Sequence, residues 1–260
     1  MKYSWKQNNE NQVIYTIEIE NKIWEKTLCS DVKKTKKALD RLIEEQMEQV
    51  LENGQFFIIS DPIYQIKQRK LGKPLIVTGT VTVGAKVSLG SYKEIADETV
   101  LEEIKKKTEK KERENLLIDY INENAKMKIP NEIIEDILKT MIEEYANRLS
   151  QQGLSIEQYF QVSQTTMEDL KEQLKPVAVR RIKGQLVLFE IAKRENLIIS
   201  EEEIEREIKR LSIRYLMTKE QVKDLIKGKE RRKLKQDLLI QKAYQFVINK
   251  NPICYENEKQ

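Results

Sequence analysis

Beyond Tyr92, apolar residues recur every three or four positions to the end of the chain, and the alternating pattern of a β-strand does not return. The first part has one long helical pattern and four strand candidates, at 2–7, 12–20, 55–66 and 75–83. We therefore predict an α+β domain at 1–92, with two hairpins against a long helix, followed by an extended all-α domain of helical hairpin arms at 93–260. The protein is predicted to be mainly α overall.

Capping and breaking residues set the predicted helix ends. In the first domain, or head, Asn21 can cap a helix that runs to Asn53-Gly54. Ser200-Glu201-Glu202-Glu203 has the pattern of a capping box. Pro176 is expected to kink the long helix around it or to mark its real start. The remaining helical stretches are predicted at 94–125, 131–150, 154–161, 167–195, 218–226 and 229–248.

The composition offers little for catalysis. The chain of 260 residues contains no His, the commonest general acid/base and metal ligand, and only two Cys, Cys29 and Cys254. The nearest match to a phosphate-binding loop begins at Gly79, but Ala85 stands where the motif requires Lys. We therefore expect no enzyme activity, no cofactor and no metal.

Charge and hydropathy narrow the class of partner. The 47 basic and 43 acidic residues give a net charge of +4, with the two signs mixed along the chain, which does not favour nucleic acid. Basic clusters at 33–37, 105–107 and 231–233 are typical of solvated helix faces. The N-terminus lacks the apolar segment of a signal peptide, and no apolar run could cross a membrane. We expect a cytoplasmic protein without a membrane partner.

Three segments have a recognisable pattern: Ile129-Pro130-Asn131-Glu132-Ile133-Ile134, the helix Pro176–Glu195 with its sequel Leu197–Ile204, and Thr80–Tyr92, which ends in Leu-Gly-Ser-Tyr. They resemble, in turn, the start of the helical domain, the long arm helix and the last strand of the N-terminal domain in trigger factor, a family of ribosome-associated chaperones. The helices from Tyr215 to Asn249 follow the family's order. The first hairpin also fits, so the resemblance covers nearly the whole chain and is strongest over 126–250.

The sequence departs from this family at two places. Trigger factor docks on the ribosome through a loop resembling G-F-R-x-G-x-x-P, whereas Val32–Leu39 contains no Gly, Phe, Arg or Pro. The family usually inserts a prolyl isomerase domain of the FKBP type after its N-terminal domain, whereas helical sequence follows Tyr92 within a few residues. The resemblance therefore implies neither ribosome docking by that loop nor isomerase activity.

The resemblance implies an ATP-independent holdase that binds unfolded or nascent polypeptides in a cradle between the head and the arms. Because arms have a thin core, some large apolar side chains should stay exposed as interaction sites. Leu211, Tyr215, Val222 and Leu225 lie where the resemblance places client contacts. The predicted client-binding residues are Met141, Tyr145, Leu149, Ile156, Tyr159, Phe160, Leu211, Tyr215, Leu216, Met217, Val222, Leu225 and Ile226.

Other functions stay open at this point. A dedicated adaptor or assembly factor for a single protein or ribonucleoprotein partner would use the basic residues at 33–37 and 231–235, and its affinity would fall steeply with salt. A periplasmic chaperone of the helical type would need the signal peptide that is missing. The sequence does not decide whether two copies pair into a homodimer.

Overall fold

The computed structural model describes residues 2–28, 31–53, 56–107 and 109–251, so Cys29, Gly54 and Cys254 lie outside the described residues. The chain packs into two compact units. Unit 1 comprises residues 1–84 and 192–242, and unit 2 comprises residues 85–191 and the chain from 243 onward. The predicted boundary between residues 92 and 93 remains a prediction.

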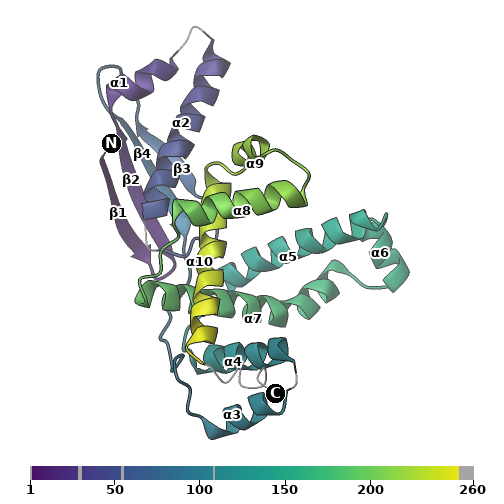
Figure 1. The fold of residues 1–260 in the computed structure, drawn as a ribbon. Coiled ribbons are helices and arrows are strands. Elements are labelled where there is room, and N and C mark those ends of the chain that lie inside the picture. The colour runs from purple at the N-terminus through teal and green to yellow at the C-terminus, as the bar shows by residue number, and fades with distance from the viewer. Residues whose placement is uncertain (1, 29–30, 54–55, 108, 252–260) are drawn as a thin grey trace. The chain divides into compact units, whose positions relative to one another are not determined.

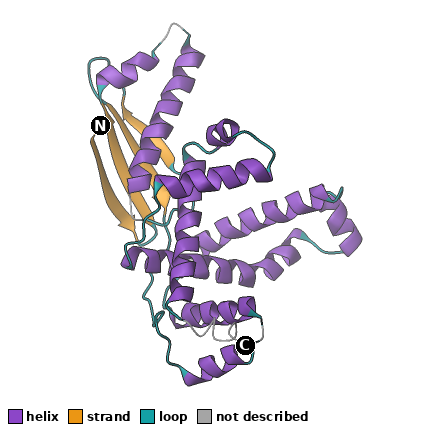
Figure 2. Cartoon of the chain, in the orientation of Figure 1, coloured by secondary structure: helices purple, strands orange, loops and turns teal. Residues whose placement is uncertain are grey.

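Unit 1 contains a four-stranded antiparallel sheet in the order β1-β2-β4-β3, with the long helix α2 (Val32–Asn53) across one face (Figure 2). The strands are β1 (Lys2–Asn9), β2 (Gln12–Ile19), β3 (Ile63–Gln68) and β4 (Leu75–Thr82). Every second residue of β2 and β4 is buried, because one face of these strands packs against α2 and the other does not. The predicted pair of hairpins against a long helix is confirmed.

The helix predicted from Asn21 to Asn53 is wrong in its first part. The chain instead forms α1 (Asn21–Trp24), a 3-10 turn at Glu25–Thr27 and then α2, and the residue at the N-cap of α1 is Glu20. Trp24 is buried, and its Nε1 donates to the carbonyl oxygen of Lys73 at 2.9 Å. This tertiary anchor fixes α1 against the end of a strand, and Leu28 is already in an extended conformation.

The third strand was predicted from 55 and begins at Ile63. Pro62 precedes it and has no N–H to donate to a ladder, so the described residues before it, 56–62, pair only through the isolated bridge between Ile58 and Val83.

Gly79 lies in the middle of β4, directly opposite Tyr15 of β2. A Cβ at position 79 would lie 2.2 Å from Cζ and Oη of Tyr15, so only glycine leaves room for this buried ring. Gly79 therefore has a packing role in a strand, and the segment does not form a phosphate-binding loop.

The rest of unit 1 is helical: α8 (Glu201–Arg214), α9 (Lys219–Leu225) and α10 (Lys229–Asn249) up to residue 242 (Figure 1). The capping box predicted at Ser200 is confirmed, and Thr218 forms a second one with Gln221. Ile204, Ile208 and Val222 form the core of this group.

Several contacts join α10 to the head within unit 1, and Lys229 at its start is hydrogen-bonded to Asp61 at 3.0 Å. Arg232 Nε donates to Glu48 Oε2 at 2.7 Å, and the Gln236 amide is hydrogen-bonded to the backbone N–H and carbonyl of Ile58.

Unit 2 contains α3 (Glu98–Lys105), α4 (Lys110–Asn124), α5 (Asn131–Gln151), α6 (Ile156–Ser163) and α7 (Met167–Arg194), the last up to residue 191. The predicted 94–125 stretch is therefore two helices, and α7 includes Pro176 within its length. Ile134, Leu138 and Met141 of α5 pack against Ala178 of α7. The end of α10 joins this unit, where Tyr244 Oη donates to Glu114 at 2.8 Å. None of the described helices is long and apolar enough to cross a membrane.

Candidate functional site

The end of α8, the turn that follows it and the end of α9 expose large apolar side chains. We define the α8–α9 surface as Ile213, Tyr215, Leu216 and Leu225, all of which are exposed. Three further predicted residues, Leu211, Met217 and Ile226, are half-buried and pack against the core of α8 and α9. Half-buried residues therefore anchor this surface on the helical core, and its exposed apolar side chains could contact a partner.

Leu216 has the most unusual environment in this surface. It is 94% exposed and has a left-handed backbone with φ of +54°. Backbone hydrogen bonds from Met217 to Ser212 and from Leu216 to Ile213 close the end of α8 around it. Glycine is the usual residue at such a helix end, because a side chain is strained there. A leucine at this position is strained and also exposes its whole apolar side chain to water.

A second group lies in unit 2, at the turn from α5 to α6. We define the α5–α6 surface as Tyr145, Ile156, Tyr159, Phe160 and Val162, of which the first four are half-buried and Val162 is exposed. The rings of Tyr145 and Tyr159 meet edge to face at 5.4 Å, and Tyr159 and Phe160 lie 5.8 Å apart. The hydrogen bond with Tyr159, together with burial, raises the pKa of Tyr145. This aromatic cluster is fixed by mutual packing and presents amphipathic edges to solvent.

The structure buries three of the predicted residues. Met141, Leu149 and Val222 are packed inside their helical groups, so these side chains do not contribute exposed surface. Helical spacing places these three residues on the same helix faces as the predicted residues that are exposed. Only tertiary packing decides which of them are buried. Val222 occupies the centre of the α8–α9 core, which makes it a structural residue in this fold.

Two exposed residues were missed by the sequence prediction, Ile213 and Val162. Each follows a predicted residue, Leu211 or Phe160, by two positions and is exposed, off the core stripe of its helix. The available signal was a β-branched apolar residue on the polar face of a helix, in its last turn.

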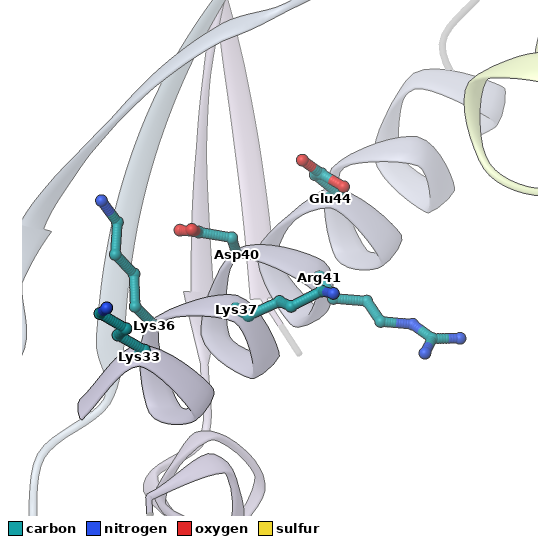
Figure 3. Close-up of a pocket in the computed structure, with 6 residues that line it drawn as sticks. All are labelled: Lys33, Lys36, Lys37, Asp40, Arg41 and Glu44. Atoms are coloured by element: carbon teal, nitrogen blue, oxygen red, sulfur yellow. The ribbon is translucent and has the colours of Figure 1, made fainter. Parts of the chain in front are cut away.

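The basic clusters have different environments. Lys33, Lys36, Lys37 and Arg41 are exposed along the start of α2 and line an open hollow of about 550 Å³ together with Asp40 and Glu44. In Figure 3, Lys33, Lys36 and Asp40 extend to one side of the helix, and Lys37 and Arg41 to the other. The hollow is therefore mixed in charge and has no single anion-binding centre.

The second cluster is mostly engaged within unit 1. Arg232 is buried against Glu48, and Arg231 is hydrogen-bonded to Glu201. Lys233 lies 3.9 Å from Glu230. These pairs leave little of the 231–235 segment for an RNA-rich partner. No group of three or more Cys, Asp or Glu in the described part of the chain could bind a metal ion.

Comparison with known proteins identifies relatives of this chain. A family model described as "Bacterial trigger factor protein (TF) C-terminus" matches residues 91–249. Trigger factor of Agathobacter rectalis is 37% identical over 163 residues, which cover 62% of this chain and 36% of that protein. Trigger factor of Lachnoclostridium phytofermentans is 38% identical over 149 residues, which cover 57% of this chain and 35% of that protein. The match therefore spans just over a third of these curated relatives.

A solved structure described as "Promiscuous Substrate Recognition in Folding and Assembly Activities of the Trigger Factor Chaperone" covers 96% of this chain and 99% of its own, at 13% identity. Its TM-score is 0.43, too low to compare the two folds further.

Proposed function

We propose that this chain, which belongs to the trigger factor family, is an ATP-independent cytoplasmic chaperone of the holdase type. Its clients would be unfolded or nascent polypeptides, bound through the α8–α9 and α5–α6 surfaces. Isomerase activity is not part of the proposal, because helical sequence occupies the place after Tyr92. The predicted cradle between head and arms stays a prediction.

The observation that supports this proposal most directly is Leu216, a strained and exposed leucine. Folding stability alone would favour glycine there and a polar residue at an exposed turn. Strained residues cluster at functional positions, and of the four non-glycine residues with positive φ in the described part of the chain, Leu216 alone is apolar. Tyr215 and Leu225 are also exposed, on two helices that share one core, and exposed apolar side chains of this kind suit a promiscuous binder.

The mechanism follows from burial of apolar area. An unfolded segment that covers these side chains gains roughly 25 cal/mol for each Å² of apolar surface removed from water, before ordering costs. Each surface is small, so each contact is weak, and several contacts on one long client add through effective concentration. Weak individual contacts also allow release without nucleotide hydrolysis.

The test is aggregation suppression. A chemically denatured model client is diluted into buffer with and without the protein, without ATP, at two salt concentrations. The wild type should suppress aggregation in proportion to its concentration at both salts, because apolar contacts are not screened. No suppression at several-fold excess would reject the chaperone function.

A quadruple variant locates the site. Ile213→Ser, Tyr215→Ser, Leu216→Ser and Leu225→Ser together should abolish most of the suppression, while circular dichroism shows a folded chain. Val222 is left unchanged because its burial would confound the result. The matched control replaces exposed apolar residues elsewhere, Ile63, Leu71, Val177 and Ile198, by Ser. Equal loss in both variants would mean that the α8–α9 surface is not the site.

The second candidate, an adaptor for a single protein or ribonucleoprotein partner, is favoured only by the exposed Lys33, Lys36, Lys37 and Arg41. Its signature would be binding that is lost as salt rises. Replacing Lys33, Lys36 and Lys37 by Gln should then abolish partner binding, and it should leave client suppression unchanged. A ribosome contact would belong to this second candidate. The family's docking loop pattern is missing at 32–39, so such a contact would have to use the basic side chains instead.

A further inference from the structure

The strand β1 forms one edge of the sheet in unit 1 (Figure 1). It pairs with β2 on one side, and among the described residues no strand pairs with its other side. All eight of its residues are exposed, on both faces. An edge of this kind presents a row of backbone N–H and C=O groups to which another extended segment can bind.

The face of β1 that continues the core is apolar and only partly covered. Tyr3 and Trp5 lie opposite Ile17 and Tyr15, two buried residues of β2, yet both aromatic side chains are exposed. Trp5 meets the ring of Phe56 edge to face at 5.0 Å. A hollow of about 40 Å³ beside them is lined by Tyr3, Trp5, Val13, Tyr15, Val50, Leu51 and Phe56. Val50 and Leu51, near the end of α2, therefore approach this face of β1 but leave Tyr3 and Trp5 about half exposed at the edge of the sheet.

The opposite face of β1 is basic. Lys2 and Lys6 lie there, and β1 contains no acidic residue. Lys2 is paired in register with Glu18 of β2, whereas Lys6 is paired with Ile14 and has no carboxylate as its cross-strand neighbour. A strand added beside β1 would place alternate side chains on the two faces, because the side-chain period of a strand is two residues.

We propose that the outer edge of β1 binds an extended polypeptide segment as a fifth strand, with apolar residues over Tyr3 and Trp5 alternating with acidic residues beside Lys6. Backbone hydrogen bonds would supply affinity that does not depend on sequence. The two faces of β1 would supply a preference for segments that alternate apolar and acidic residues. This site is separate from the α8–α9 and α5–α6 surfaces, and it does not depend on their function.

The probe is a blocked peptide of alternating Val and Glu with the same length as β1, eight residues. The chain has two Trp: Trp5 is 55% exposed and Trp24 is 1% exposed, so Trp5 fluorescence reports on the edge. A saturable change in emission is expected. Two further peptides have every second backbone nitrogen methylated, in alternate phases. One phase should lose at least tenfold in affinity and the other should retain it, because only one set of N–H groups faces β1.

Charge reversal tests the stated chemistry. Lys6→Glu should lower the affinity for the Val/Glu peptide roughly three- to fivefold. It should raise the affinity for a Val/Lys peptide by a similar factor, as cross-strand charge pairs do. The matched control is Lys67→Glu on β3, the other edge of the sheet, which should change neither affinity. Circular dichroism should show that both variants fold.

Several results would overturn the proposal. One is equal binding of both methylated peptides, which would exclude strand pairing. A second is an equal effect of Lys67→Glu, which would mean general electrostatic attraction. A third is loss of peptide binding in the quadruple serine variant of the α8–α9 surface, which would mean that the peptide binds there and not at β1. The last is a dimer, seen by sedimentation, that the peptide dissociates, since the edge would then belong to a second copy.

Discussion

Arg232 Nε lies 2.7 Å from Glu48 Oε2, and the two side chains are only 6% and 12% exposed. A buried pair of this kind is strongly destabilised when one partner is removed, because the other charge stays buried alone. Arg232→Met should therefore lower the free energy of unfolding by about 3–5 kcal/mol. Urea titration followed by circular dichroism measures it.

The matched control is the double variant Arg232→Met with Glu48→Leu. It removes both charges and should recover most of the loss, since a well-packed apolar pair can replace a buried ion pair. A double variant as unstable as Arg232→Met alone would mean that packing of the arginine stem, and not its charge, is what matters.

Gly79→Ala should destabilise the sheet. The added Cβ would meet the Tyr15 ring at 2.2 Å, and relief requires movement of a buried side chain. Overpacking of this kind costs about 1–3 kcal/mol, measurable as a lower urea midpoint.

Gly184→Ala provides the contrast to this variant. It lies in helix α7, where the nearest atom to an added Cβ, Nδ2 of Asn122, is at an ordinary 3.4 Å. Because alanine is a better helix former, this change should raise stability by up to about 1 kcal/mol. Destabilisation of similar size by both variants would contradict the role given to Tyr15.

Leu216→Gly should have opposite effects on stability and function. Removing the side chain relieves the strain of φ +54° and should raise the free energy of unfolding by up to about 1 kcal/mol. The same change removes exposed apolar surface, so client suppression should fall.

Gln164→Gly is the control for Leu216→Gly, because Gln164 also has φ of +54° but is polar. It should raise stability and leave suppression unchanged. Full suppression by Leu216→Gly would remove Leu216 from the proposed site.

The pair Glu144–Arg181 predicts a dependence of stability on pH. Hydrogen bonds from Arg181 hold the pKa of Glu144 below its ordinary value of 4.5. A carboxyl whose pKa is lowered by folding contributes stability above its ordinary pKa, and loses it as the pH falls through the folded value. Glu144→Gln should therefore destabilise at neutral pH by a few tenths of a kcal/mol, as a half-exposed pair does.

The difference between Glu144→Gln and wild type should disappear at an acid pH below the lowered pKa of Glu144 in the folded protein, because the wild-type carboxyl is then uncharged as well. Glu143→Gln, the exposed neighbour, is the matched control for the loss of one charge. Urea midpoints at both pH values test this, and a pH-independent difference would contradict the ion pair.

Local signals in the sequence predicted the helix ends well. The capping box at Ser200 and the start of α5 after Pro130 depend on neighbouring residues alone, so the pattern contains the needed information. The break after Trp24 depends on a hydrogen bond to Lys73, 49 positions away, and periodicity cannot register such a contact. The misplaced start of β3 reflects the missing N–H of Pro62.

The candidate surfaces were predictable only in part. Tyr215 and Val222 have the same apolar character in the sequence, yet one is exposed and the other is buried, because α10 packs on only one face of α8 and α9. The strain at Leu216 is a property of the backbone and has no counterpart in hydropathy. Arg232 belongs to a run that is typical of a solvated face, and its burial depends on a partner 184 positions earlier.

That separation has a consequence for the order in which the protein is made. A ribosome that has just added Glu48 must still synthesise 184 positions before Arg232 is in the chain and the buried pair can form. At about 5–20 residues per second, this interval is roughly 10–40 s. During it the contact face of the head is without α10, and a growing chain therefore exposes this face to whatever else is nearby. The final assembly of unit 1 is consequently a late event in biosynthesis, although its strands are made first.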